Sequence, residues 1–266
     1  MVQNIAEEAA SYIQTRVSQV PRVAIVLGSG LSELADQLNN PIRISFDEIP
    51  HYPPPTVPGH VGELVFGTLS GVPVIVTRGR FHYYEGHSLD LVTLHVRVFA
   101  QLGAETVIIT NAAGCTREEW NIGDLMLITG HLDYTFLEGP HDPVLTTGPP
   151  CYSDELLEVA REASRRIDLP LREGTYTWCL GPTFETPAEI REIQSLGGTA
   201  AGMSTVPEIR AAAEEGLKVL GVSCLTNYAA GIKDQPLNHA EVLEAGIRVK
   251  EIFSRFISEI LVSLKD

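Results

Sequence analysis

Short apolar runs that end in a glycine or a polar cluster recur along the chain and constrain its fold more than any other feature. The first is Val23-Ala24-Ile25-Val26-Leu27, bounded by Pro21 and Gly28, a pattern typical of a buried strand. Further strand-like runs cover 61–69, 72–77, 105–110, 124–129, 173–180 and 217–224. Helical patterns lie between many of these runs, so the sequence predicts an α/β fold with a largely parallel or mixed sheet.

Helices are predicted at both ends of the chain. The first covers residues 5–19 and is expected on the surface. The last covers about 239–263, where Asn238 is the expected N-cap, Glu241 is its capping-box partner and an apolar stripe follows.

Two segments rich in proline and glycine, 50–58 and 140–150, are predicted to be loops long enough to act as lids. The chain has 266 residues and shows no repeat or linker. We therefore expect one domain over residues 1–266.

The charge balance excludes several classes of partner. A formal net charge of −15 argues against nucleic acid, because a protein that binds the phosphate backbone needs a basic surface. No apolar run reaches the roughly 18 residues of a membrane helix, and Glu7 and Glu8 do not fit a signal peptide. A cytoplasmic protein with no membrane partner is expected, and any phosphate-bearing ligand must find its positive partners locally.

No metal site is predicted. The four cysteines form no C-x-x-C pair and are expected to be buried free thiols: Cys115, Cys151, Cys179 and Cys224. A metal is one interpretation of four polar residues in a Gly/Pro-rich region: His131, Asp133, His141 and Asp142. Because they offer no ligand pair on a helix face, an ordinary solvated loop is the favoured interpretation.

Two polar clusters follow apolar runs and suit an anion. Gly28-Ser29-Gly30 can bring backbone N–H groups and a hydroxyl to a phosphate, although a plain strand-to-helix turn explains it equally well. It lacks the G-x-G-x-x-G and G-K-[ST] patterns of dinucleotide and P-loop sites. The second cluster has Arg80, His82 and Tyr84 at alternate positions, so in an extended segment the three side chains point the same way. An arginine and an imidazole aimed together suit an oxyanion, although a solvated strand end is the alternative.

Other strand ends carry groups suited to a flat heterocycle. The small residues of Asn111-Ala112-Ala113-Gly114 permit close backbone approach, and Asn227 can donate and accept at once. Phe184 can stack on a ring while Glu185 accepts two N–H donors, although Glu185 equally suits the first turn of a helix at 187–196. Ser204 either caps the next helix or donates to an anion.

In this order the segments closely resemble the trimeric, low-molecular-mass purine nucleoside phosphorylases of the inosine/guanosine type. The resemblance spans nearly the whole chain and rests on motifs in register: Gly28-Ser29-Gly30, Thr56-Val57-Pro58-Gly59-His60, Gly79-Arg80-Phe81-His82, Asn111-Ala112-Ala113-Gly114, Gly181-Pro182-Thr183-Phe184-Glu185-Thr186, Gly202-Met203-Ser204-Thr205-Val206-Pro207-Glu208, Thr226-Asn227 and Asn238-His239.

The resemblance implies a role for each matching residue. The implied phosphate pocket comprises Ser29, His60, Arg80, His82, Ala112 and Ser204. The implied sugar contacts are Tyr84, Met203 and His239, and the implied base contacts are Ala113, Gly114, Phe184, Glu185 and Asn227. Asn227, His82 and Glu185 are the implied catalytic residues.

The resemblance also implies a mixed sheet with a distorted barrel surrounded by helices, a homotrimer, and no cofactor beyond phosphate as co-substrate. The implied reaction is phosphorolysis of 6-oxopurine (deoxy)ribonucleosides, inosine and guanosine, to free base and (deoxy)ribose 1-phosphate. The transition state then resembles an oxocarbenium ion between an anion and a departing base, with Asn227 bonded to N7 of the purine.

One segment, 131–153, departs from the family pattern. It lacks the phenylalanine that in relatives reaches the sugar site of a neighbouring subunit, which leaves Tyr152 and Phe136 as candidate replacements. The alternatives are a 5′-methylthioadenosine phosphorylase, a catalytically silent nucleoside-binding relative and a hydrolytic nucleosidase. Asn227 and His239 argue against the first, and the phosphate-pocket residues argue against the other two.

Overall fold

The computed structural model describes residues 2–54, 56, 61–137, 139, 143–234 and 239–265, apart from the side chains of 239–243. Within these ranges the strands form one ten-stranded sheet. They are β1 Val23–Leu27, β2 Asn39–Ser45, β3 Glu63–Leu69, β4 Val72–Arg78, β5 Thr106–Cys115, β6 Leu125–Asp133, β7 Val144–Thr147, β8 Arg172–Trp178, β9 Gly198–Gly202 and β10 Lys218–Tyr228.

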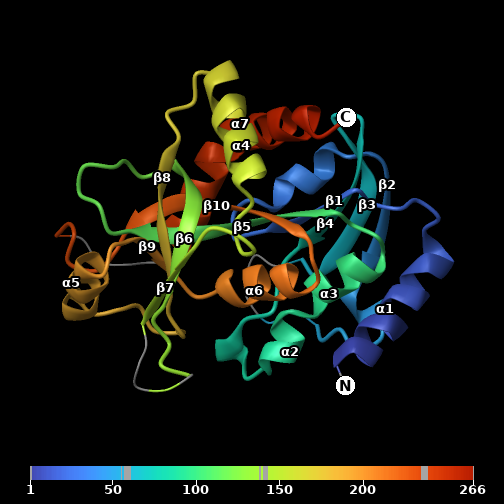
Figure 1. The fold of residues 1–266 in the computed structure, drawn as a ribbon, viewed down its shortest axis with the longest axis horizontal. Coiled ribbons are helices and arrows are strands. Elements are labelled where there is room, and N and C mark those ends of the chain that lie inside the picture. Colours follow the sequence, from blue (N-terminus) through green and yellow to red (C-terminus); the bar gives the residue numbers. More distant parts are fainter. Residues whose placement is uncertain are drawn as a thin grey trace.

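Helices cover both sides of this sheet. In the view of Figure 1, α4 and α7 lie above β5 and β10, and α2, α3 and α6 lie below them. The α-helices are α1 Val2–Arg16, α2 Leu89–Val92, α3 Leu94–Gln101, α4 Asp154–Arg166, α5 Pro187–Ser195, α6 Val206–Glu214 and α7 His239–Ser263. Short 3-10 helices are η1 Ser32–Gln37, η2 Phe46–Glu48 and η3 Tyr83–Glu85.

The sheet closes on itself at one end. The strand order is β10-β6-β8-β9-β5-β1-β4-β3-β2, and β10 also pairs with β5. Strands β5, β10, β6, β8 and β9 therefore form a ring, while β1, β4, β3 and β2 extend from β5 as an open sheet. Parallel and antiparallel pairs both occur, so the expected mixed sheet with a distorted barrel is confirmed.

The pattern of apolar runs predicted β1, β3, β4, β5, β6, β8 and β10 correctly. All five residues of β1 are buried, and β5 begins with the buried run Thr106-Val107-Ile108-Ile109-Thr110. Such continuous apolar or β-branched runs are typical of parallel strands that are covered on both faces. The terminal helices are confirmed, with α1 displaced to residues 2–16. Asn238, the expected cap of α7, lies outside the described residues.

Three strands were missed. The prediction that 140–150 is a loop was wrong for Val144–Thr147, which pairs with the end of β6 as a largely exposed antiparallel strand. Strand β2 is an exposed edge strand that contains Pro41 beside an irregular register, and β9 is built from Gly, Thr and Ala. None of these segments buries enough large apolar residues to give a strand signal.

The helices in the described ranges include none with the length and apolar character that crossing a bilayer requires.

Candidate functional site

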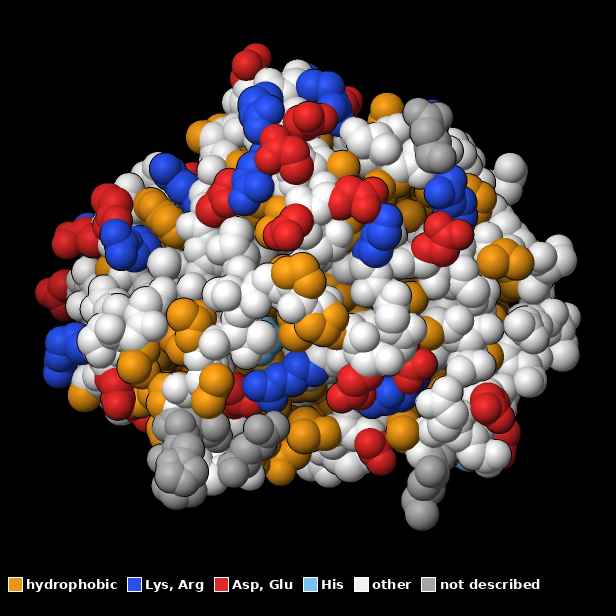
Figure 2. Space-filling model, in the orientation of Figure 1, with side chains coloured by type: hydrophobic (Ala, Val, Ile, Leu, Met, Phe, Trp, Pro, Cys, Tyr) orange, Lys and Arg blue, Asp and Glu red, His pale blue; other side chains and the backbone are white. Residues whose placement is uncertain are grey.

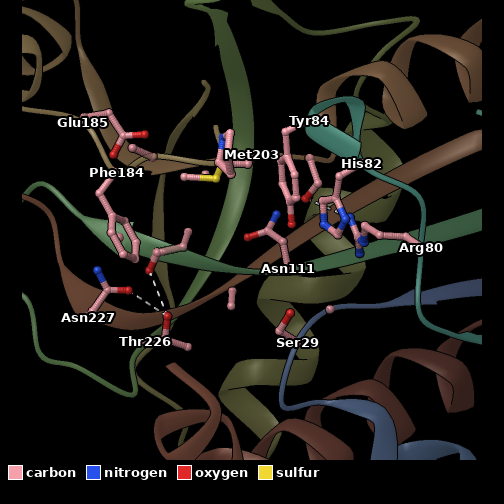
Figure 3. A pocket seen from close by; sticks show the side chains of 18 of the residues that line it. Ser29, Arg80, His82, Tyr84, Asn111, Phe184, Glu185, Met203, Thr226 and Asn227 are labelled. Carbon is pink, nitrogen blue, oxygen red and sulfur yellow. Dashed lines mark hydrogen bonds between the residues drawn. The ribbon is translucent and has the colours of Figure 1, made fainter. Parts of the chain in front are cut away.

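A cavity of about 510 Å³ lies where the carboxyl ends of β1, β5 and β10 meet the loops after β4 and β8. Figure 3 shows its side chains in two groups: Ser29, Arg80 and His82 at one end, and Phe184, Glu185 and Asn227 at the other. Tyr84, Met203 and Asn111 lie between the two groups. The carboxyl edge of a sheet is where open α/β folds hold ligands.

Ser29 is placed by close contact between two strand ends. The N–H of Gly28 donates to the Thr110 hydroxyl at 3.1 Å, and that hydroxyl donates to the Val26 carbonyl at 2.9 Å. A Cβ on Gly28 would lie 2.6 Å from the Cα of Asn111, so only glycine permits this approach. The first turn after β1 therefore lies directly against the end of β5.

Arg80 is almost completely buried, with 2% of its surface exposed, yet it lines the cavity. Its Nη1 donates to Glu208 at 2.8 Å, to Ser204 at 3.1 Å and to Thr205 at 3.2 Å. Its Nη2 donates to the carbonyl of Thr110. The guanidinium is thus fixed by partners from β5, from the turn before α6 and from the first turn of α6.

His82 is paired with the acid Glu85, as Arg80 is with Glu208. Its Nδ1 lies 3.0 Å from Glu85 Oε1, and its backbone N–H donates to the same oxygen at 2.7 Å. Burial lowers the pKa of His82, which favours a neutral imidazole that donates from Nδ1. Burial also opposes ionisation of Glu85, but hydrogen bonds from His82 and Thr56 outweigh it and bring that pKa to about 2.

Tyr84 and Met203 form the middle of the site. The Tyr84 ring stacks on the His82 ring, with 4.8 Å between centroids, and burial raises the pKa of Tyr84 to about 12. Its hydroxyl is therefore neutral and able to donate. Gly181, with φ of +71°, lies behind both residues; a Cβ there would be 2.4 Å from Met203 Sδ and 3.0 Å from the Tyr84 ring.

Asn227 reaches the cavity from an irregular point in β10. The register between β10 and β5 shifts between Leu225 and Asn227, a bulge that redirects the side chains beyond it. The Thr226 hydroxyl donates to Asn227 Oδ1 at 3.1 Å, and Nδ2 donates to the Tyr228 carbonyl at 3.0 Å. These bonds assign the amide orientation and leave one acceptor site and one N–H for a ligand.

Glu185 presents a buried acceptor. Its Oε1 is buried and has no partner among the described residues, while the Cys179 thiol bonds to its carboxyl group. Burial raises the pKa of Glu185, and the Cys179 bond partly offsets that effect. A buried acceptor without a protein partner in a cavity wall is suited to a ligand that brings N–H donors.

The residues predicted from the sequence converge on this cavity. Every site residue predicted from the sequence lines it except His60, which lies outside the described residues, and His239, which begins α7 but whose side chain is not described. Ser204 does not cap α6, because Thr205 is the N-cap and Ser204 accepts from Arg80 instead. Ala112, Ala113 and Gly114 form the wall from β5.

Sequence reasoning missed the acids that hold the basic groups. Glu208 ends one of the motifs and Glu85 lies three residues after another, but neither was given a role, and His95, which contacts Glu208, was not singled out. The only local signal for Glu208 was its capping-box position three residues after Thr205. A pairing across 128 residues leaves no trace in local spacing.

The possible metal group does not assemble in the described part of the chain, where no three His, Cys, Asp or Glu side chains gather closely enough to hold an ion. His131 bonds to the Tyr152 hydroxyl and Asp133 to Arg210. His141 and Asp142 lie outside the described residues. The cysteines are free thiols, buried except for Cys151, which is half-buried.

Comparison with known proteins identifies the family. The model of the Phosphorylase superfamily matches residues 22–262. Purine nucleoside phosphorylase 1 of Geobacillus stearothermophilus is 47% identical in an alignment of 262 residues that covers 96% of this chain and 96% of that one. The structure of Schistosoma mansoni purine nucleoside phosphorylase with inosine has a TM-score of 0.89 at 33% identity and covers 99% of this chain and 97% of that one.

The structure of Schistosoma mansoni purine nucleoside phosphorylase in complex with adenosine is also similar, with a TM-score of 0.88 at 33% identity over 98% of this chain and 97% of that one. Matches of this identity over nearly full length settle the relationship. The chain belongs to the purine nucleoside phosphorylase family within the phosphorylase superfamily.

Proposed function

We propose that this chain is a purine nucleoside phosphorylase that converts 6-oxopurine (deoxy)ribonucleosides and phosphate to free base and (deoxy)ribose 1-phosphate. The observation that carries the proposal is one cavity with Arg80, His82 and two serines at one end and Glu185 with Asn227 at the other. Phosphate is the co-substrate and no cofactor is needed. The whole chain, 1–266, is proposed to act as one domain in the cytoplasm.

The two ends of the cavity suit the two partners of the reaction. A phosphate oxygen forms a bond to the anomeric carbon as the bond from that carbon to purine N9 breaks, and the base takes the bonding electrons. Charge developing on the base is relieved by a proton that solvent water delivers to N7 and that the attacking hydrogen phosphate gives up to solvent; the N7–H then donates to the open acceptor site of Asn227. Asn227 Nδ2 donates to O6, and Glu185 accepts from N1–H.

The proposed phosphate ligands lie at one end of the cavity: Ser29, Arg80, His82, Ser204 and the backbone N–H of Ala112. Tyr84 and Met203 are the proposed sugar contacts. The proposed roles of His60, as a loop group over the phosphate, and of His239, as a sugar contact, rest on the sequence motifs alone.

Phosphate dependence is the first test. Replacing Arg80 with Ala should raise the KM for phosphate and lower turnover by about 10²-fold, because it removes a preorganised charged donor. Arg22→Ala changes an exposed arginine outside the cavity and serves as control. Steady-state rates of base release from inosine measure both, and equal wild-type rates in phosphate-free buffer would indicate a hydrolase instead.

Base selectivity is the second test. Adenosine brings a 6-amino donor against the Asn227 N–H and a bare N1 lone pair against Glu185, two mismatches of about 1–3 kcal/mol each. We expect kcat/KM for adenosine to be on the order of 10³-fold below that for inosine or guanosine. Because a structure of the Schistosoma protein contains adenosine, binding of adenosine alone does not test selectivity, and the ratio of the kcat/KM values is the quantity to measure.

Asn227→Asp should partly relax this discrimination, because aspartate can accept from the 6-amino group. Asn121→Asp makes the same change at an exposed asparagine outside the cavity and should leave the ratio unchanged. Wild-type values for adenosine within tenfold of those for inosine would show that these residues do not select the base as proposed.

The raised pKa of Glu185 predicts a pH dependence of base binding. Because only the ionised carboxylate accepts from N1–H, the KM for inosine should rise as pH falls through this raised pKa, by up to about tenfold per pH unit. Glu185→Gln should raise the KM at pH 7.5 and flatten the acid limb. Glu189→Gln on the same segment removes a charge that helps to raise the pKa of Glu185, so this control should keep the wild-type slope with its midpoint moved to lower pH. An unchanged slope in Glu185→Gln would assign the titration to another group.

A homotrimer is the proposed assembly, with apolar surface near β7 as part of its contact. Phe136, Leu137, Val144 and Leu145 are all more than two-fifths exposed. Orange side chains are frequent at the lower left of Figure 2, where β7 lies in Figure 1, while acidic and basic side chains are interspersed above them. Tyr152 is fully buried and bonded to His131, which leaves Phe136 as the candidate for the aromatic contributed to a neighbour.

Light scattering should give about three times the 29.0 kDa chain mass. Phe136→Glu should weaken the assembly and lower kcat/KM for the nucleoside, whereas Val20→Glu, at an exposed valine outside the strands and helices, should do neither. A monomeric wild type with full activity is the result that contradicts this proposal.

A further inference from the structure

Arg80 and Glu208 form an ion pair that is closed off from solvent behind the phosphate end of the cavity. Glu208 lies in the first turn of α6 and is fully buried. Its Oε2 accepts from Arg80 Nη1 at 2.8 Å and from the backbone N–H of Thr205 at 3.0 Å. Burial opposes ionisation of Glu208, but the charge of Arg80 and a hydrogen bond from His95 outweigh it and bring the pKa to about 2.

His95 holds the other oxygen of this carboxylate. Its Nε2 lies 2.7 Å from Glu208 Oε1. It belongs to α3, is 1% exposed and packs among aromatic rings, with centroids 6.2 Å from Phe81 and 5.8 Å from Phe99. His95 does not line the cavity, so it acts on a ligand only through residues it contacts, and Glu208 is the one it hydrogen-bonds.

The same carboxylate supports a strained turn. Thr205 has φ of +77° and ψ of −52°, and the N–H of Val206 donates to the Ser204 carbonyl at 2.9 Å, which makes a γ-turn that is rare for a β-branched residue. Besides its N–H bond to Glu208, Thr205 accepts from Asn111 Nδ2 at 2.9 Å and from Arg80. Such a conformation persists where surrounding bonds fix it, and it places Ser204 at the cavity.

We propose that His95 is a positioning residue for phosphate, acting through Glu208 to fix both Arg80 and the turn that carries Ser204. This inference rests on the proposed phosphorylase function. A carboxylate bonded through one oxygen can rotate about its own axis, whereas one bonded through both oxygens has a fixed plane. The planar guanidinium bonded to it then has a fixed direction, and bidentate recognition of an oxyanion depends on that direction.

The test compares His95→Phe with His95→Gln. Phenylalanine fills the aromatic pocket but cannot donate to Oε1, whereas glutamine keeps an N–H donor. We expect His95→Phe to raise the KM for phosphate by about tenfold or more, and His95→Gln to stay within about threefold of wild type. The Kd for hypoxanthine, measured without phosphate, should change less than about twofold in both variants, because base contacts do not pass through Glu208.

A purely structural role for His95 predicts a different pattern, in which Tm falls while phosphate and hypoxanthine binding change together or not at all. That pattern, or an unchanged phosphate KM in His95→Phe, would overturn the proposal. If His95→Phe does not fold, His95→Asn, whose shorter side chain does not span the distance to Glu208, replaces it with the same expected outcome. The rise in Tm caused by saturating phosphate gives an independent measure of phosphate affinity.

His131→Phe is the matched control. His131 is also fully buried and is bonded through Nδ1 to the Tyr152 hydroxyl, but it lies on β6 outside the cavity. We expect it to lower Tm without a selective change in phosphate KM. Failure of the proposed function is recognised separately, because the wild type would then show no phosphate-dependent release of base at all.

Discussion

Strand β5 is the constraint on which the rest of the structure depends, because it pairs with three strands at once. Its first residues pair with β1, its last two with β9, and most of its length with β10. This shared strand joins the closed ring to the open part of the sheet. Since β1, β5 and β10 run parallel, their carboxyl ends meet at one edge, and the residues after each strand become neighbours there although they are far apart in sequence.

Local patterns were enough to predict the strands that form this edge and most of the groups presented at it. A buried apolar run precedes each of four cavity residues: Ser29, Arg80, Ala112 and Asn227. Such runs can be recognised in a sequence because a strand buried on both faces consists mainly of apolar residues. Strands β2 and β7 are largely exposed, so they need no continuous apolar run, and both were missed. Pairings such as Arg80 with Glu208 were also out of reach, because only the folded chain brings the two residues together.

The base end of the cavity shows how burial and hydrogen-bond polarity act together. Glu185 and Asn227 come from different segments, and each is held by a neighbour: Cys179 bonds to the carboxyl and Thr226 to the amide. With these partners in place, the remaining capacity of the pair is one buried carboxylate oxygen, one amide acceptor site and one amide N–H. A ligand matches this set when one edge of it carries two donors with an acceptor between them. A 6-oxopurine protonated at N7 has such an edge, made of N7–H, O6 and N1–H.

The end of the cavity proposed to hold phosphate differs from the base end, because its basic side chains are already paired with acids. Arg80 is bonded to Glu208, and His82, whose burial favours the neutral form, is bonded to Glu85. The chain as a whole carries a formal charge of −15, which at physiological ionic strength is largely screened beyond a Debye length of about 8 Å. Long-range repulsion between this charge and a phosphate anion is therefore weak at the cavity. On the proposed function, selection of the anion depends on donors held at fixed directions, and the acids bonded to Arg80 and His82 are the groups that fix those directions.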